Sequence, residues 1–169
     1  MSAVEGHAMP SVSAEQRDAL ARPQRAGPPR SFDEFEQRLP CIAGRVPLAP
    51  ADWTGRRAAT LARRAGACDH LITAALVHDF ARYFDGREEA CVARRSADLL
   101  VAVFPEPVLE PMRCLDGRPS DPGAAPAPRA VTQGRRLRAY IDSASTCSDD
   151  LLLPWQTLLG IARRASFDG

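Results

Sequence analysis

The sequence predicts an all-helical protein, and three observations lead to this fold class. Several segments repeat apolar residues at helical spacing, and no segment alternates polar and apolar residues as a half-buried strand would. Alanine supplies much of the 45% hydrophobic content, and aromatic residues make up only 6% of the chain, which favours helices in close contact. A length of 169 residues suits one domain. We expect a disordered leader at 1–30 and a single helical domain at 31–169.

The first helix is expected to begin just after the leader. Residues 1–30 contain four prolines, scattered charges and little apolar pattern, as disordered segments do. The stretch Ser31-Phe32-Asp33-Glu34 then has the spacing of a capping box, in which the hydroxyl and the later carboxylate each accept a backbone N–H. This box predicts a short helix that ends near Leu39.

Three helices are expected to pack together at the centre of the fold. The helix at 53–65 has an alanine and leucine face, and Gly66 is suited to end it. The helix at 70–84 has Asp69 as its expected N-terminal cap. A third helix is predicted at 88–103, and its inward-facing residues are expected to be Val92, Leu99, Leu100 and Val103.

The remainder of the chain is expected to form three more helices and a loop. Pro107 suits the first turn of a helix that ends near Leu115. The segment 116–128 is rich in proline, glycine and alanine, which predicts a loop. Two helices are expected after it, one at 134–143 and one from about Leu151 or Pro154 to Ala165.

Charge and composition exclude several classes of partner. The net charge is +1, and all 22 basic residues are arginine, so no strong field favours nucleic acid or a membrane surface. No run of about 20 apolar residues predicts a membrane span, and we see no signal peptide. Five widely spaced cysteines without a CxxC motif suggest free thiols. We therefore expect a cytoplasmic protein that binds neither nucleic acid nor membrane; the sequence predicts no oligomeric state.

His78 and Asp79 are the residues with the clearest chemical potential. They stand together after an apolar run, in LITAALVHDFARYF at 71–84. An imidazole nitrogen and a carboxylate suit Fe, Mn or Zn, and such an ion could polarise a phosphoryl group, lower a water pKa or, if it is iron, activate oxygen. A complete site needs about four ligands, so partners must come from other helices. The alternative is a pair at a helix surface that binds nothing.

The segment RAATLARRAGACDHLITAALVHDFARYF resembles the core of the HD-domain superfamily. FPEPVLEPMR and GRRLRAYIDSAS are similar to one branch of it, the HD-type diiron oxygenases related to the phosphonate-cleaving oxygenase and myo-inositol oxygenase. The likeness covers 51–116 and 133–163. It implies an HD-domain-like helical bundle and a metal-dependent phosphohydrolase or oxygenase activity.

The resemblance also implies a metal site of up to four histidines and two aspartates. His78 and Asp79 match the family's His-Asp pair. The family's late aspartate falls at Ile141 or at Asp142, so the candidate metal ligands are His78, Asp79 and Asp142. The three remaining histidine positions hold residues that are poor ligands or none: Thr54, Val92 and Leu115.

These departures lead us to expect an incomplete site without a metal cofactor. The chain would then be a pseudoenzyme that acts as a ligand-binding or regulatory module, with a small anionic ligand in the former metal pocket. The alternative is an active enzyme that holds Fe, Mn or Zn through His78 and Asp79, with Asp52 or Asp142, and acts on a small phosphorylated or phosphonate substrate. A mononuclear Zn site that adds Cys91 and Cys114 is a further possibility. The arginines of helix 134–143 are expected to form a solvated face.

Overall fold

The computed structural model describes residues 27–43, 54–84, 91–115, 127–146 and 151–167. Helices are the regular secondary structure of this part, and no strand occurs among the described residues, so the predicted all-helical class is confirmed. Nearly all of the expected leader at 1–30 lies outside the described residues. The helices are α2 Phe32–Ala43, α3 Thr54–Arg64, α4 Asp69–Val77, α5 Phe80–Phe84, α6 Val92–Leu99, α7 Glu106–Arg113, α8 Pro128–Ala144 and α9 Trp155–Arg164.

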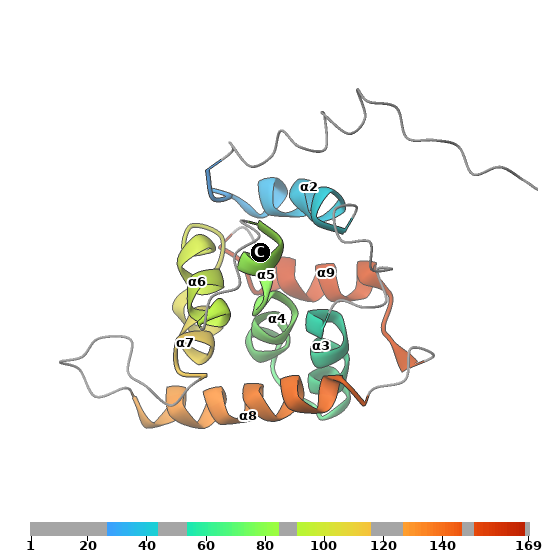
Figure 1. Ribbon diagram of the computed structural model, residues 1–169, viewed down its shortest axis with the longest axis vertical. Helices are drawn as coiled ribbons and strands as arrows, with labels where there is room; N and C mark the ends of the chain where they lie inside the picture. The colour runs from blue at the N-terminus through green and yellow to red at the C-terminus, as the bar shows by residue number, and fades with distance from the viewer. Residues whose placement is uncertain (1–26, 44–53, 85–90, 116–126, 147–150, 168–169) are drawn as a thin grey trace, which may run out of the picture.

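Helix α4 lies at the centre of the bundle, in contact with α3, α7, α8 and α9 (Figure 1). Every residue from Leu71 to Val77 is buried, as expected for a helix that is apolar on all sides. Its one polar residue in this run, Thr73, is satisfied because its hydroxyl donates to the Asp69 carbonyl at 2.8 Å. The expected central group of three helices is partly correct: α3 packs against α4 and α6 packs against α5, the two halves of the predicted helix 70–84, but α3 and α6 do not pack closely against each other.

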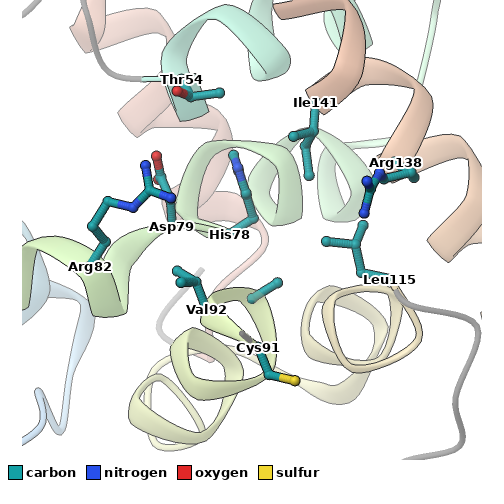
Figure 2. Close-up of a pocket in the computed structure, with 10 residues that line it drawn as sticks. Thr54, His78, Asp79, Arg82, Cys91, Val92, Leu115, Arg138 and Ile141 are labelled. Atoms are coloured by element: carbon teal, nitrogen blue, oxygen red, sulfur yellow. The ribbon is translucent and has the colours of Figure 1, made fainter. Parts of the chain in front are cut away.

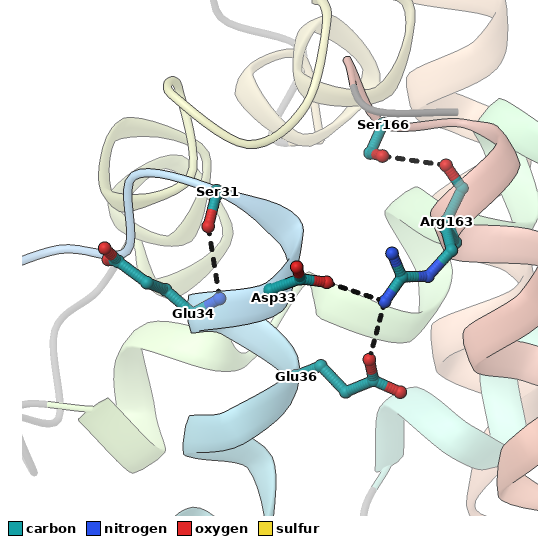
Figure 3. A network of polar contacts seen from close by, with 6 residues as sticks. All are labelled: Ser31, Asp33, Glu34, Glu36, Arg163 and Ser166. Carbon is teal, nitrogen blue, oxygen red and sulfur yellow. Dashed lines mark hydrogen bonds and ion pairs between the residues drawn. The ribbon is translucent and has the colours of Figure 1, made fainter.

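Helix α2 lies at the end of the bundle opposite α8 (Figure 1). Its rings of Phe32 and Phe35 are fully buried, and both contact Phe104 at centroid distances of 6.1 and 5.5 Å. From α9, the Arg163 guanidinium binds the carboxylates of Asp33 and Glu36, each at 2.8 Å (Figure 3). The same guanidinium lies 4.6 Å from the centre of the Phe32 ring. Aromatic burial and one arginine thus fasten α2 to the rest of the fold.

The capping box at the start of α2 is confirmed in its first half. The Glu34 N–H donates to the Ser31 hydroxyl at 3.2 Å (Figure 3). The Glu34 carboxylate reaches back to the Arg30 N–H at 3.0 Å, one residue earlier than the usual pattern. The helix itself continues to Ala43, beyond the predicted end near Leu39.

Gly66 ends α3 as predicted. Its φ is +68°, a conformation that glycine adopts without steric cost. The Gly66 N–H donates to the Arg63 carbonyl at 3.1 Å, and the Ala67 N–H donates to the Ala62 carbonyl at 3.0 Å. These two bonds form a Schellman motif, which turns the chain directly into α4.

The predicted cap of α4 by Asp69 is wrong. Cys68 occupies the N-cap position with extended backbone, and among the described residues its side chain makes no capping hydrogen bond. Asp69 is instead the first helical residue, and its carboxylate accepts a hydrogen bond from Arg164 of α9 at 2.8 Å. The Asp69 carboxylate is therefore bound by Arg164 and does not cap the N-terminus of α4.

The predicted continuous helix at 70–84 is interrupted at the His-Asp pair. Helix α4 ends at Val77 and α5 begins at Phe80, so His78 and Asp79 form the turn between them. The His78 ring contacts the carbonyl of Ala75, which in a continuous helix would accept the N–H of Asp79. The side chain thus competes with the backbone where the helix breaks.

The second half of the chain follows the prediction with shifted ends. Pro107 lies in the first turn of α7, as expected. Helix α8 begins at Pro128 rather than near 134, and the remaining predicted loop at 116–126 lies outside the described residues. Helix α9 starts after Pro154, one of the two predicted starts. No helix in the described part is long and apolar enough to cross a membrane.

Candidate functional site

A pocket of about 280 Å³ opens beside the turn that follows α4. Its walls come from helices that are far apart in the sequence: α3, the His-Asp turn, α5, α6, the end of α7 and α8 (Figure 2). The expected neighbours of the pair do lie beside it. The positions that the resemblance assigned to a metal site and that line this pocket are Thr54, His78, Asp79, Val92, Leu115 and Ile141.

His78 is held in a defined orientation. The residue is 7% exposed, and its Nδ1 atom lies 2.9 Å from the carbonyl oxygen of Ala75. A carbonyl oxygen only accepts, so Nδ1 carries the proton and donates it. In the neutral ring, Nε2 is then the nitrogen with a lone pair. Metal-binding histidines are commonly oriented in this way by a backbone carbonyl.

Asp79 lies on the same wall and is 3% exposed. A buried carboxylate needs hydrogen bonds or opposite charge nearby. Arg82, one turn further along in α5, also lines the pocket, and its guanidinium points toward the Asp79 carboxylate (Figure 2). The negative charge of Asp79 is thus partly offset at the pocket itself.

Asp142 is placed apart from His78 and Asp79. Its side chain is 60% exposed, and its carboxylate accepts hydrogen bonds from the Arg138 Nε at 2.9 and 3.1 Å. Its neighbour Ile141 is the residue that lines the pocket. The family's late aspartate could correspond to Ile141 or to Asp142. Only Ile141 lines the pocket, so Ile141 is the residue that occupies this position of the site.

Two arginines of the pocket were missed by the sequence analysis. Arg138 does lie on the expected solvated face, with 53% of its side chain exposed, and it also lines the pocket beside Leu115 and Ile141 (Figure 2). The signal was present in the spacing, because residues three apart, such as 138 and 141, share one face of a helix. Arg82 follows His78 by four positions, and residues four apart also share one face of a helix.

The side chains of this pocket do not fit a dinuclear metal site. His78 and Asp79 are strong ligands, and the Thr54 hydroxyl is a weak one. Val92, Leu115 and Ile141 have no lone pair to offer. Among the residues that the structure describes, no three His, Cys, Asp or Glu side chains form a group that could hold a metal ion. Asp52, the other proposed partner, lies outside the described residues.

The alternative zinc site is also not assembled. Cys91 lines the pocket, but its sulfur points away from His78 (Figure 2). Cys114 is buried against Gly134 of α8 and is not among the residues that line the pocket. Burial raises the pKa of the Cys114 thiol above its ordinary value, which disfavours the thiolate that a metal requires. The four residues therefore do not converge.

The pocket combines two kinds of surface. Three half-buried apolar side chains, Val92, Leu115 and Ile141, form one part. His78, Arg82 and Arg138 provide hydrogen-bond donors or lone pairs around it, and Asp79 provides one carboxylate. Such a mixture can hold a small molecule with an anionic group and an apolar body.

Comparison of the chain with protein-family models, with curated proteins and with solved structures gave no match. The likeness to HD-domain proteins therefore rests on the residues of this chain alone.

Proposed function

We propose that this protein is an HD-domain-like module that binds a small organic anion in the pocket at His78, without the metal chemistry of that superfamily. The observation that supports it most is the convergence of six positions on one pocket. Five of them match metal-ligand positions of the family directly, and the sixth, Ile141, is one of the two residues at which the family's late aspartate falls; together they span residues 54 to 141. Chance surface positions would not be expected to meet in this way. Apolar side chains at three of them favour a ligand-binding site over a metal centre.

The charges of the pocket suggest where the anionic group of the ligand would lie. Asp79 and Arg82 lie on one side, and Arg138 lies on the other, beside Leu115 and Ile141 (Figure 2). An anion is repelled by the Asp79 carboxylate, so the Arg138 side is the more favourable; there it would share the Arg138 guanidinium with the Asp142 carboxylate, which accepts from Nε at 2.9 and 3.1 Å. The apolar part of the ligand would then cover Leu115 and Ile141. A short-chain phosphonate or carboxylate has this chemistry.

Calorimetry with three probes tests this proposal: inorganic phosphate, butylphosphonate and butyrate. We expect the two butyl compounds to bind more tightly than phosphate, because only they can cover the apolar wall. Arg138→Ala should weaken their binding about tenfold or more, as loss of a charge-assisted hydrogen bond would. Arg135→Ala on the same helix is the matched control and should bind as the wild type does. Absence of binding by all three probes, or an unchanged affinity of Arg138→Ala, would reject the proposal.

The alternative function is a metal-dependent phosphohydrolase or oxygenase. It is favoured by one observation, the His78 ring held by the Ala75 carbonyl with Nε2 left as the lone-pair nitrogen. The protein would then need ligands beyond His78 and Asp79. Elemental analysis after growth with added Fe, Mn and Zn separates the two functions: stoichiometric metal supports the enzyme, and none after reconstitution supports the anion-binding module.

A further inference from the structure

A second pocket, of about 360 Å³, lies at the other end of α4. The start of α4, the helix α7 and the first turns of α8 enclose it. Its polar lining contains both signs of charge, from Arg129 and Glu110, together with the amide of Gln133. Its apolar lining includes Leu71 and Pro111. It shares no lining residue with the pocket at His78.

The Gln133 amide gives the first indication of a ligand. Its Oε1 atom is buried, and within the described part of the chain it has no hydrogen-bond partner. Burying such an acceptor without a donor is unfavourable, so an external donor in this pocket would stabilise the protein once a rotation of the amide turns Oε1 toward it. A ligand with an N–H group is one such donor, and a water molecule is the other.

The two charged residues give a second, independent indication. Neither Arg129 nor Glu110 makes a side-chain hydrogen bond or ion pair with another described residue. Two other arginines do so: Arg113 binds Glu106 at 2.7 Å and Arg164 binds Asp69 at 2.8 Å. A cation and an anion that face one pocket without binding one another can each bind the opposite charge of a ligand.

The start of α4 adds a site for a carboxylate. Cys68 at its N-cap makes no capping hydrogen bond with any described residue, and both Cys68 and His70 line the pocket. The N-terminal N–H groups of a helix carry partial positive charge and favour anions. The helix end and Arg129 therefore form the positive side of the pocket, and Glu110 with Gln133 Oε1 forms the side that attracts hydrogen-bond donors.

We propose that this pocket binds a small zwitterion, an α-amino acid with an apolar side chain. Its carboxylate would bind Arg129 and the start of α4, and its ammonium group would bind Glu110 and Gln133 Oε1. Its side chain would cover Leu71 and Pro111. A simple anion such as phosphate would leave Glu110 and Gln133 Oε1 without partners, so the paired charges favour the zwitterion. The inference does not depend on the function proposed for the pocket at His78.

Calorimetry on the full chain carrying Arg138→Ala, which removes the anion-binding side of the pocket at His78, tests the proposal with three matched compounds: L-leucine, N-acetyl-L-leucine and L-leucinol. The second lacks the ammonium group and the third lacks the carboxylate. We expect L-leucine to bind at least tenfold more tightly than either. Equal binding of the three compounds, or no binding of L-leucine, L-isoleucine, L-valine and L-methionine, overturns the proposal and leaves the pocket to water alone.

Variants separate loss of binding from loss of folding. Arg129→Gln, Glu110→Gln and Gln133→Leu should each weaken L-leucine binding at least tenfold. Gln133→Leu removes the buried acceptor, so the Tm of the free protein should stay unchanged or rise. Arg135→Gln and Arg138→Ala should leave L-leucine binding unchanged, which distinguishes this pocket from the one at His78. If Gln133→Leu bound L-leucine as tightly as the wild type does, the amino-acid site assigned to this pocket would be wrong.

Alkylation of Cys68 gives a readout at the pocket itself. Cys68 and Cys91 are both exposed thiols, and only Cys68 lines this pocket. L-leucine should slow the reaction of Cys68 with iodoacetamide, measured by peptide mass spectrometry, and should leave Cys91 unaffected. Equal rates at Cys68 with and without the amino acid would contradict the proposal.

Discussion

The imidazole of His78 donates through Nδ1 to the carbonyl oxygen of Ala75, at a distance of 2.9 Å. Ala75 lies in the last turn of α4, and His78 is the first residue after that helix. The bond fixes the ring against the end of α4 and places the side chain in the wall of the pocket. It links the break between α4 and α5 to the geometry of the candidate site.

Replacement of His78 by Ala should therefore destabilise the protein. The change removes a buried ring and its hydrogen bond, and we expect a loss of about 1–3 kcal/mol in the free energy of unfolding, measured in urea. The matched control is His70→Ala, an exposed histidine in the first turn of α4, which should change the free energy by less than about 0.5 kcal/mol. Similar effects of the two substitutions would contradict the structural role given to His78.

A pair of glycine substitutions tests the packing of α7 against α8. A Cβ atom at Gly134 would lie 2.8 Å from the carbonyl oxygen of Cys114, so Gly134→Ala must move the two backbones apart. We expect it to destabilise the protein by about 1–3 kcal/mol, as overpacking does. At Gly160 of α9, a Cβ atom would meet no atom of the described residues within 4 Å. Gly160→Ala should therefore stabilise the protein by about 0.5–1 kcal/mol, because alanine favours helix. Thermal or urea unfolding that gave both variants the same sign would refute this account.

Arg163 should control the attachment of α2. Its guanidinium binds Asp33 and Glu36 and lies over the Phe32 ring (Figure 3). Arg163→Gln should raise the hydrogen-exchange rates of the α2 amides while the amides of α4 stay protected, since Phe32 and Phe35 alone would hold the helix. Arg164→Gln is the control, because Arg164 binds Asp69 of α4 instead. If Arg164→Gln raised the exchange rates of the α2 amides and Arg163→Gln did not, the role given to Arg163 would be wrong.

Much of the helical framework could be predicted because it depends on local chemistry. Ser31 accepts a hydrogen bond at the start of α2, Gly66 adopts the left-handed conformation that ends α3, and Pro107 occupies the first turn of α7. Each of these depends on residues within about one turn. The helical spacing of the apolar residues then predicted which face of each helix is buried.

The errors occurred where distant contacts or side-chain geometry decide the outcome. Asp69 was expected to cap α4, but it binds Arg164, which lies 95 positions later. At the helix break, the imidazole of His78 bonds back to the Ala75 carbonyl, a contact that residue spacing does not reveal. Arg82 and Arg138 line the pocket because the fold brings α5 and α8 to its opposite sides (Figure 2). The sequence could name the candidate pair but could not assemble the whole pocket.

The strongest test of the HD-like geometry is to rebuild its metal site. Thr54, Val92 and Leu115 are half-buried and line the pocket with His78 and Asp79. If these positions keep the geometry of metal ligands, then changing all three to His should create a site with four imidazoles and one carboxylate. Elemental analysis after reconstitution with Fe(II) or Mn(II) should find bound metal in this triple variant. Adding His78→Ala to it should remove most of that metal, since the oriented ring is lost.

The wild type provides the other half of this test. We expect it to take up no dinuclear iron or manganese under the same conditions, because Val92 and Leu115 offer no lone pair and Thr54 offers only a weak hydroxyl ligand. His78→Ala should then leave the metal content of the otherwise wild-type chain unchanged. A triple variant that folds with unchanged circular dichroism yet binds no metal would argue against the HD-like geometry. A dinuclear load in the wild type would instead make the metal-dependent enzyme the better reading of this pocket.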